Sequence, residues 1–407
     1  MNVAVAIAGL AFLILVHEAG HFVVALAVHM RPRKFYVFFP PALVKRVRNG
    51  IEYGIGSIPL GGYVKIPGMH KPAAGDLDAH LERAVGEAPW LARGIEPVKH
   101  ELSAGRLEEA RAALPELRSE VEAAVLSDAA RRDADRGLTE LDDGLSPEAY
   151  WRAPAWKRIA VIFAGPATNL VFAVVLLAIV YMLGVPVDTT REVHTVVAGT
   201  PAEAIGLRPG DEILAVAGAP VAPDRISHTI RESKGKEITL TVRRDGERVE
   251  LGPARAREID GIFRLGFVLD ARYQGYGFAK SVELASRDTW AVTKAIVGSL
   301  GRIVTGSGRD EVSSPVGIVQ GSSEALQNDY RDYLGILALI SLSLALLNLL
   351  PLLPLDGGHI AFSIVEKLRG KAIPREAYER VSAIGIAVVL LLFFLGLSND
   401  IGRLNGG

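Results

Sequence analysis

Apolar residues gather in four blocks along the chain, and these blocks give the first prediction. They cover residues 3–28, 159–183, 333–353 and 381–397. A helix needs roughly 20 apolar residues to cross a bilayer, so three blocks are long enough alone and the fourth needs its flanks. The pattern predicts a polytopic α-helical membrane protein with about four transmembrane helices. These helices would contact the lipid bilayer directly.

The stretches between the blocks have patterns of their own. Residues 51–69 alternate around Gly61 and Gly62, which predicts a membrane-associated β-hairpin. Residues 71–150 place apolar residues at helical spacing, which predicts a helical insert, with Pro115 starting a new helix. We expect eight segments: transmembrane helix 1 (1–30), a cytoplasmic basic loop with the hairpin (31–70), a cytoplasmic helical insert (71–150), transmembrane helix 2 (157–184), an α+β domain (187–272), an amphipathic extracytoplasmic segment (273–332), transmembrane helix 3 (333–358) and transmembrane helix 4 (381–398).

Lys and Arg near the spans predict the orientation of the chain. The basic stretch "RPRKFYVFFPPALVKRVR" follows the first block, Lys157 and Arg158 precede the second, and "EKLRGKAIPREAYER" separates the third and fourth. Such residues favour the cytoplasmic side of a membrane. The N-terminus, residues 185–332 and the C-terminus are then outside. The formal net charge of −1 gives no reason to expect a nucleic-acid partner.

Residues 193–221, "VHTVVAGTPAEAIGLRPGDEILAVAGAPV", precede further strand-like segments. This order resembles a PDZ domain, a module that binds extended peptides by adding a strand to its own sheet. The resemblance implies an extracytoplasmic PDZ-like domain with a peptide ligand, or one that only excludes bulky substrates. Residues 278–300 are amphipathic and would lie on the outer membrane surface or pack on this domain.

The first block contains chemistry that a plain membrane span does not need. It includes "VHEAGHF", in which His17 and His21 stand four residues apart and share one helix face. Glu18 completes the H-E-x-x-H pattern of zinc proteases, in which the carboxylate acts as general base. Polar side chains in hydrocarbon are costly unless they find a partner, and a bound dication would compensate for all three. Mutual pairing without a metal is the alternative.

Two histidines leave a zinc centre in need of a third protein ligand, with a further position open for water. The candidates near a membrane-buried position are Asp356, His359 and Glu366. Asp356 is favoured because two prolines precede it and two glycines follow it, which predicts irregular backbone inside the membrane. Such backbone is tolerated where it lines a wet cavity or is buried in protein. The alternative is a helix-ending turn at the membrane surface.

The HEAGH residues, "NLLPLLPLDGG" near the third span and the PDZ-like module between spans resemble the site-2 protease family of intramembrane zinc metalloproteases. More narrowly, the chain resembles the bacterial branch that cuts membrane-anchored anti-sigma factors. The resemblance implies a Zn²⁺ cofactor and three kinds of site residue. They are the zinc ligands His17, His21 and Asp356, the general base Glu18, and the substrate-binding residues Asn348, Gly61, Gly62, Tyr63 and Val64.

The expected function is therefore hydrolysis of peptide bonds in or near the transmembrane segment of single-span substrates, with anti-sigma factors as the expected clients. The enzyme would lie in the bacterial cytoplasmic (inner) membrane, with its active site opening towards the cytoplasmic side. A catalytically silent PDZ membrane scaffold is the alternative. A metal transporter is disfavoured because the other spans lack further acidic or histidine residues. The role of the 71–150 insert stays open.

Overall fold

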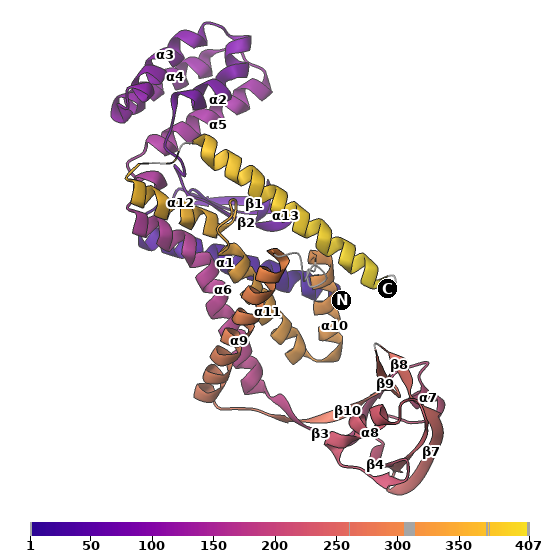
Figure 1. Cartoon of the computed structure of the whole chain (residues 1–407). Coiled ribbons are helices and arrows are strands. Elements are labelled where there is room, and N and C mark those ends of the chain that lie inside the picture. The colour runs from indigo at the N-terminus through magenta and orange to yellow at the C-terminus, as the bar shows by residue number, and fades with distance from the viewer. Residues whose placement is uncertain (1, 260, 305–313, 372, 374, 405–407) are drawn as a thin grey trace. The chain divides into compact units, whose positions relative to one another are not determined.

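The computed structural model describes residues 2–259, 261–304, 314–371, 373 and 375–404. The chain forms two compact units, each of which is described by itself (Figure 1). Unit 1 comprises Met1–Leu177 and Ser286–Gly407, and unit 2 comprises Ala178–Ala285.

Four helices of the described chain are long and apolar enough to cross a membrane. They are α1 (Asn2–Ala27), α6 (Ala155–Leu183), α11 (Tyr330–Asn348) and α13 (Arg375–Leu404). Together with the β-sheets below, they make this a polytopic membrane protein with a β domain, which confirms the coarse fold predicted from the apolar blocks.

Helices α1 and α11 pack closely inside unit 1. The Tyr333 hydroxyl of α11 donates a hydrogen bond to the Val5 carbonyl of α1 at 2.9 Å. A β-carbon added at Gly9 would stand 2.2 Å from the Tyr333 hydroxyl oxygen, so a larger residue there would force the Tyr333 side chain to move. Small residues allow membrane helices to approach in this way. Leu13 and Leu337 belong to the same apolar cluster.

The third apolar block ends earlier than the predicted boundary at residue 358. Helix α11 stops at Asn348, and α12 (Asp356–Arg369) begins after seven irregular residues, 349–355. The prediction that Gly357 and Gly358 loosen the backbone is wrong, because both lie in the first turn of α12. A β-carbon at Gly357 would stand 2.3 Å from the Leu349 carbonyl oxygen. The glycines instead allow the start of α12 to pack directly on the irregular segment.

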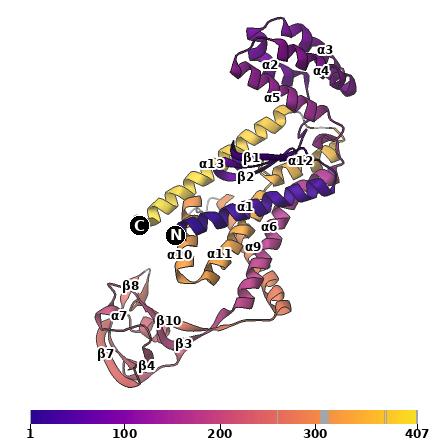
Figure 2. The same cartoon turned by 180° about the vertical axis from the view of Figure 1, so that it is seen from behind.

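The predicted basic loop is a strand, and the predicted hairpin is one half of a larger sheet. Strands β1 (Lys34–Arg48) and β2 (Ile51–Lys65) pair antiparallel, and residues 34–37 lie between 52–55 on one side and 62–65 on the other. Aromatic and β-branched residues in "KFYVFF" favour strand over loop in spite of the basic flanks. The sheet lies beside α1 in both views (Figures 1 and 2).

The insert contains four helices around its own apolar core. They are α2 (Ala74–Glu87), α3 (Leu91–Ser103), α4 (Leu107–Ala123) and α5 (Asp128–Leu145), followed by the short 3₁₀ helix η1 (Tyr150–Arg152). The prediction that Pro115 starts a helix is wrong, because it lies inside α4. A proline there costs about 3 kcal/mol. The buried Leu114, Leu117 and Val121 keep α4 packed against the core and outweigh that cost.

Unit 2 is built on an antiparallel sheet with strand order β10-β3-β4-β6-β7, to which β5 adds beside β4. Ile213, Leu240 and Val242 are fully buried in its core. Its elements are β3 (Val185–Val196), α7 (Pro201–Ala204), β4 (Glu212–Val216), β5 (Ala219–Pro220), η2 (Pro223–Arg225), α8 (Ile226–Glu232), β6 (Glu237–Arg244), β7 (Glu247–Arg255), β8 (Arg257–Ile259), β9 (Ile262–Arg264) and β10 (Phe267–Gln274).

The segment predicted at 273–332 contains two helices within the described residues. Helix α9 (Phe278–Val304) covers the amphipathic stretch, and α10 (Pro315–Asn328) follows it. Residues 305–313 of the predicted segment lie outside the described residues. Asp400 near the end of α13 accepts hydrogen bonds from the backbone N–H groups of Ser314 and Gly317, which fixes the start of α10 against α13.

Candidate metal centre

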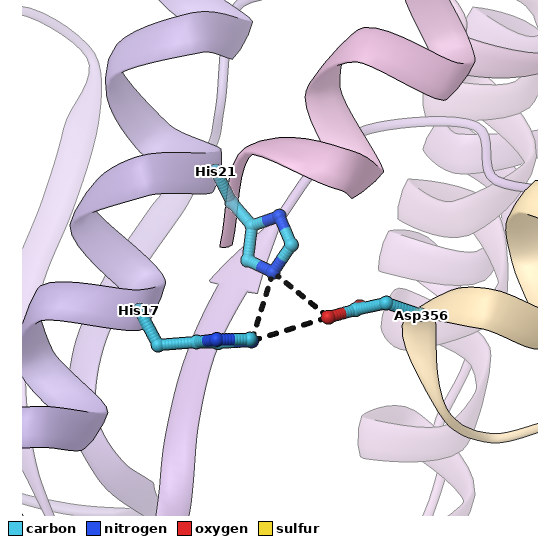
Figure 3. A group of neighbouring side chains, drawn as sticks. All are labelled: His17, His21 and Asp356. Atoms are coloured by element: carbon cyan, nitrogen blue, oxygen red, sulfur yellow. Dashed lines mark hydrogen bonds and ion pairs between the residues drawn. The ribbon is translucent and has the colours of Figure 1, made fainter. Parts of the chain in front are cut away.

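Helix α1 places two imidazoles on one face. His17 and His21 are one helical turn apart, and each is only 7% exposed. Their Nε2 atoms lie 3.2 Å from each other. The H-E-x-x-H spacing therefore produces the shared face that the sequence predicts, and both nitrogens point to a common centre (Figure 3).

Asp356 reaches the same centre from the first turn of α12, although it lies more than 330 residues further along the chain. Its Oδ2 atom lies 3.1 Å from Nε2 of His17 and 3.4 Å from Nε2 of His21. Figure 3 shows the carboxylate facing the two rings from the opposite side. Within the described chain, these three side chains form the one group of His, Cys, Asp or Glu residues that could hold a metal ion.

The distances among the three donor atoms fit zinc. In a tetrahedral zinc site with bonds of about 2.0–2.2 Å, neighbouring donor atoms stand about 3.3–3.6 Å apart. The three measured separations of 3.1, 3.2 and 3.4 Å lie at or just below the short end of this range. Two imidazole nitrogens and one carboxylate are a donor set that zinc accepts, and three protein ligands leave a fourth position open for water or substrate.

The second imidazole is held in the orientation that a metal ligand needs. Nδ1 of His21 lies 2.8 Å from the Val161 carbonyl of α6. A carbonyl can only accept, so Nδ1 carries the proton and the Nε2 lone pair faces the centre. Metal-binding histidines commonly have such a partner on the other ring nitrogen.

Asn169 is the corresponding neighbour of His17, and sequence reasoning missed it. Its side-chain amide lies 3.4 Å from Nδ1 of His17, and the residue is completely buried in α6. Its Oδ1 has no hydrogen-bond partner among the described residues. Turning the amide by 180° lets Oδ1 accept from Nδ1–H and leaves Nε2 of His17 for a metal. The sequence feature that could have identified Asn169 is an amide side chain in an otherwise apolar span.

Two glycines bring α6 and α1 together at this point. A β-carbon at Gly165 would stand 2.3 Å from Nε2 of His21, and one at Gly20 would stand 2.6 Å from the Ala164 carbonyl oxygen. A side chain at residue 165 would occupy the space beside the imidazoles, and one at residue 20 would collide with the backbone of α6. The backbone of α6 therefore lies directly on the two rings and helps to shield them.

Glu18 is the third polar residue of the motif, and it faces the sheet. A β-carbon at Gly62 would stand 2.1 Å from Cγ of Glu18 and 3.0 Å from its Oε1 atom. Strand β2 therefore passes directly over the carboxylate that lies next to His17 in the sequence. The structure brings together a candidate base, a candidate metal centre and a strand.

The other predicted substrate-binding residues have different positions. Asn348 is the last residue of α11, where the chain leaves the helix towards Asp356. A β-carbon at Gly61 would stand 2.7 Å from the Phe39 ring. Tyr63 and Val64 line a cavity beside the insert.

The two remaining candidates for a third ligand do not belong to the group of His17, His21 and Asp356. The His359 ring lies 6.4 Å from the Tyr378 ring, measured between centroids. Glu366 forms a partly buried ion pair with Arg158 of α6.

Comparison with known proteins gives a whole-chain match. The profile of peptidase family M50 matches residues 5–392. Zinc metalloprotease RasP of Oceanobacillus iheyensis is 28% identical over 96% of this chain and 96% of its own length. The regulator of sigma-W protease RasP of Bacillus subtilis is 29% identical, and zinc metalloprotease RasP of Bacillus licheniformis is 29% identical, each with 96% of both chains covered.

Proposed function

The chain belongs to peptidase family M50, the site-2 protease family of zinc metalloproteases, and we propose that it hydrolyses peptide bonds in or near the membrane segment of single-span proteins. The observation that carries this proposal is the convergence of His17, His21 and Asp356 beside Glu18. This group lies between α1, α6 and α12, in a chain whose described part contains four helices long and apolar enough to span a membrane.

We assign the zinc ligands to Nε2 of His17, Nε2 of His21 and Oδ2 of Asp356. A zinc ion held by them supplies Lewis-acid chemistry, which acidifies water and polarises a peptide carbonyl. The Val161 carbonyl and Asn169 orient the imidazoles from behind. Because both rings are buried, the ligands are pre-positioned and little reorganisation accompanies the reaction.

Glu18 moves the proton in this scheme. Its carboxylate oxygen accepts a proton from the attacking water and then donates it to the amide nitrogen that leaves. Its contact with Gly62 holds the carboxylate beside the strand on which we place the substrate. A glutamine at residue 18 has nearly the same shape but cannot accept this proton, so the chemistry and the fold can be tested separately.

The substrate must be extended before it can react. Every carbonyl inside a helix already accepts a hydrogen bond from the residue four positions ahead. Strand addition supplies replacement partners for an unwound segment. We place this segment along residues 62–65 of β2, with the Asn348 side chain hydrogen-bonded to its backbone. Gly61, Gly62, Tyr63 and Val64 then form the substrate-binding edge.

Substrate class, location and orientation follow as parts of the same proposal. The name of the Bacillus subtilis relative, a regulator of sigma-W protease, supports a membrane-anchored anti-sigma factor as the client. We place the chain in the bacterial inner membrane with its Lys- and Arg-rich β1 side, and the active-site opening, towards the cytoplasm. Unit 2 is then an extracytoplasmic PDZ-like domain, supported by its antiparallel sheet with α8 and by the sequence resemblance.

Co-expression with candidate anti-sigma factors tests the proposal. The wild type should convert the membrane-anchored fragment to a soluble one, whereas the Glu18→Gln variant should accumulate the anchored fragment. A Glu116→Gln variant is the matched control, because Glu116 is an exposed acid of the insert. Equal fragment release by wild type and Glu18→Gln would favour the alternative of a silent scaffold.

A further inference from the structure

We propose that a cavity between β2 and the insert binds the cytosolic residues that flank the membrane segment of the substrate, and that it prefers Lys or Arg there. The inference rests on the proposed function and extends it to substrate selection. The cavity has a volume of about 390 Å³. Residues 63–66 form one wall, and residues of α2 and α5 form the opposite wall. We call it the insert cavity.

The insert cavity runs along the free edge of the strand that passes Glu18. Residues 62–65 pair with 34–37 of β1 along one edge. Successive side chains of a strand point to opposite faces. The consecutive residues 63–66 nevertheless all line the cavity, so it lies against the strand edge and not against one face. A peptide added to that edge would therefore continue into the cavity.

The distance along the strand sets which substrate residues reach the cavity. Gly62 contacts Glu18, and residues 63–66, one to four positions later, line the cavity. A strand rises about 3.3 Å per residue, so these residues lie about 3–13 Å from Gly62 along the strand. Residues about one to four positions from the cleaved bond would lie beside α2 and α5. In a protein that is cut close to the membrane boundary, these residues belong to its cytosolic flank.

The lining of the cavity fits a basic side chain with an aliphatic stem. Leu77, Leu81 and Leu141 provide apolar surface for methylene groups. Glu140 of α5 provides the charge that a substrate cation can meet, because Asp76 of α2, another lining acid, accepts a hydrogen bond from the Ala73 N–H at the start of its helix. Asp143 is likewise engaged, by Arg33 at 3.2 Å and by Lys65 at 3.7 Å.

Glu140 can exchange its present partners for a substrate cation at little cost. Its carboxylate pairs with His80 at 3.4 Å and with Arg136 at 3.2 Å, and the Arg136 side chain is 74% exposed. An exposed pair between residues four apart on a helix is worth only about 0.3–0.5 kcal/mol. Single-span proteins carry an excess of Lys and Arg on their cytosolic flank. The charge at Glu140 therefore complements the expected substrate.

A cleavage assay with designed substrates tests the preference. Three single-span reporters would share one membrane segment and carry Lys-Arg, Gly-Ser or Asp-Glu residues at the cytosolic flank. The wild type should cleave the Lys-Arg reporter about ten-fold more efficiently than the Asp-Glu reporter, measured as kcat/KM and caused mainly by KM. Glu140→Lys should remove or reverse this ratio, while Glu116→Lys, a charge reversal outside the cavity, should preserve it. The same ratio in all three proteins would overturn the proposal.

Cross-linking tests binding without catalysis. The chain contains no cysteine, so single cysteines can be introduced without background. A His80→Cys variant that also carries Glu18→Gln should form a disulfide with reporters whose cysteine lies about one to four residues from the cleaved bond. The matched Glu116→Cys variant should not. Uniform cross-linking along the reporter, or none, would overturn the cavity assignment.

The two proposals fail in different ways. Reporters that the wild type never cuts, but that still cross-link through His80→Cys, would refute the protease assignment and support the cavity. Suppose instead that reporters are cut only when Glu18 is present, but show neither a flank preference nor a cross-link. This result would support the protease assignment and refute the cavity assignment.

Competition by a soluble Lys-Arg peptide without a membrane segment would show that the cavity recognises the flank itself. No competition, even at high peptide concentration, would contradict that recognition.

Discussion

Gly62 lies so close to Glu18 that a β-carbon at residue 62 would stand 2.1 Å from Cγ of the glutamate. Real β-carbons essentially never approach another atom this closely, so either the strand or the carboxylate must move if residue 62 changes. The contact ties the position of the candidate base to the position of the substrate-binding strand. Substitutions at Gly62 should therefore disturb catalysis without touching a metal ligand.

A Gly62→Ala variant should lose about 100-fold in cleavage rate, because displacing a reacting group by about 1 Å has an effect of this size. Its zinc content should equal that of the wild type. Gly335→Ala is a suitable control, since a β-carbon there meets nothing within 4 Å. Rates can be measured with a purified single-span reporter. An unchanged rate in Gly62→Ala would show that the strand does not constrain Glu18.

Asn169 should contribute to zinc affinity through His17. An Asn169→Leu variant keeps the side-chain volume but removes the only polar group found beside Nδ1 of His17 within the described chain. Loss of such an outer partner typically weakens metal binding by about 10–100-fold. Chelator competition on the purified protein measures this change. Thr168→Val is the control, because the Thr168 hydroxyl donates to the Ala164 carbonyl of its own helix. An equal loss of zinc affinity in both variants would point to general damage of α6.

The partly buried ion pair between Arg158 and Glu366 should position Asp356. It joins α6, which orients His21, to α12, which carries the carboxylate. Removing one partner of a fully buried pair costs about 3–5 kcal/mol, and the cost should be lower for this partly buried pair. We expect Arg158→Gln to lower thermal stability and to weaken zinc binding at least ten-fold, with Arg158→Lys restoring much of both. Full zinc affinity in Arg158→Gln would separate the ion pair from the metal centre.

Unit 2 should lose stability in acid through Asp211. Burial raises the pKa of this carboxyl, but hydrogen bonds from Arg244 and from the Arg208 backbone outweigh burial and hold the pKa below its ordinary value of 3.8. A lowered native pKa means that the ionised form stabilises the fold. The stabilisation from ionised Asp211 is fully present at a pH above the ordinary pKa. It is lost as the pH falls through the lower pKa that Asp211 has in the folded protein.

The Asp211→Asn variant should lower the free energy of unfolding of unit 2 by about 2 kcal/mol at pH 7, the value of hydrogen bonds to a charged group. Hydrogen exchange of β4 and β6 in the full chain measures it. The difference between variant and wild type should shrink below pH 3.8. A constant difference across this range would show that ionisation of Asp211 is not involved.

Local patterns predicted part of the structure well. The four apolar blocks predicted the spans because length and composition alone determine whether a helix fits a bilayer. Helical spacing predicted that the His17 and His21 side chains share one face of the helix. Asp356 was selected among candidates by its unusual sequence context, and the structure brings it within 3.4 Å of both imidazoles.

Non-local contacts explain the errors. Residues 62–65 pair with β1, and neither the register nor the partner of a strand is visible in its own sequence. Pro115 stays inside α4 because Leu114, Leu117 and Val121 of the same helix are buried in the core that the insert's other helices complete. Asn169 was missed as a site residue because its role depends on His17, more than 150 residues away. The insert cavity likewise exists only where two separate segments meet.

Zinc K-edge absorption of the purified Glu18→Gln protein tests the central claim most directly. The account predicts about one zinc per chain, bound by two imidazole nitrogens and by oxygen at distances of about 2.0–2.2 Å. The same measurement on His21→Ala and Asp356→Ala should show the zinc lost or the matching scatterer missing. Zinc that keeps an unchanged spectrum in both variants would contradict the assignment of these side chains as its ligands.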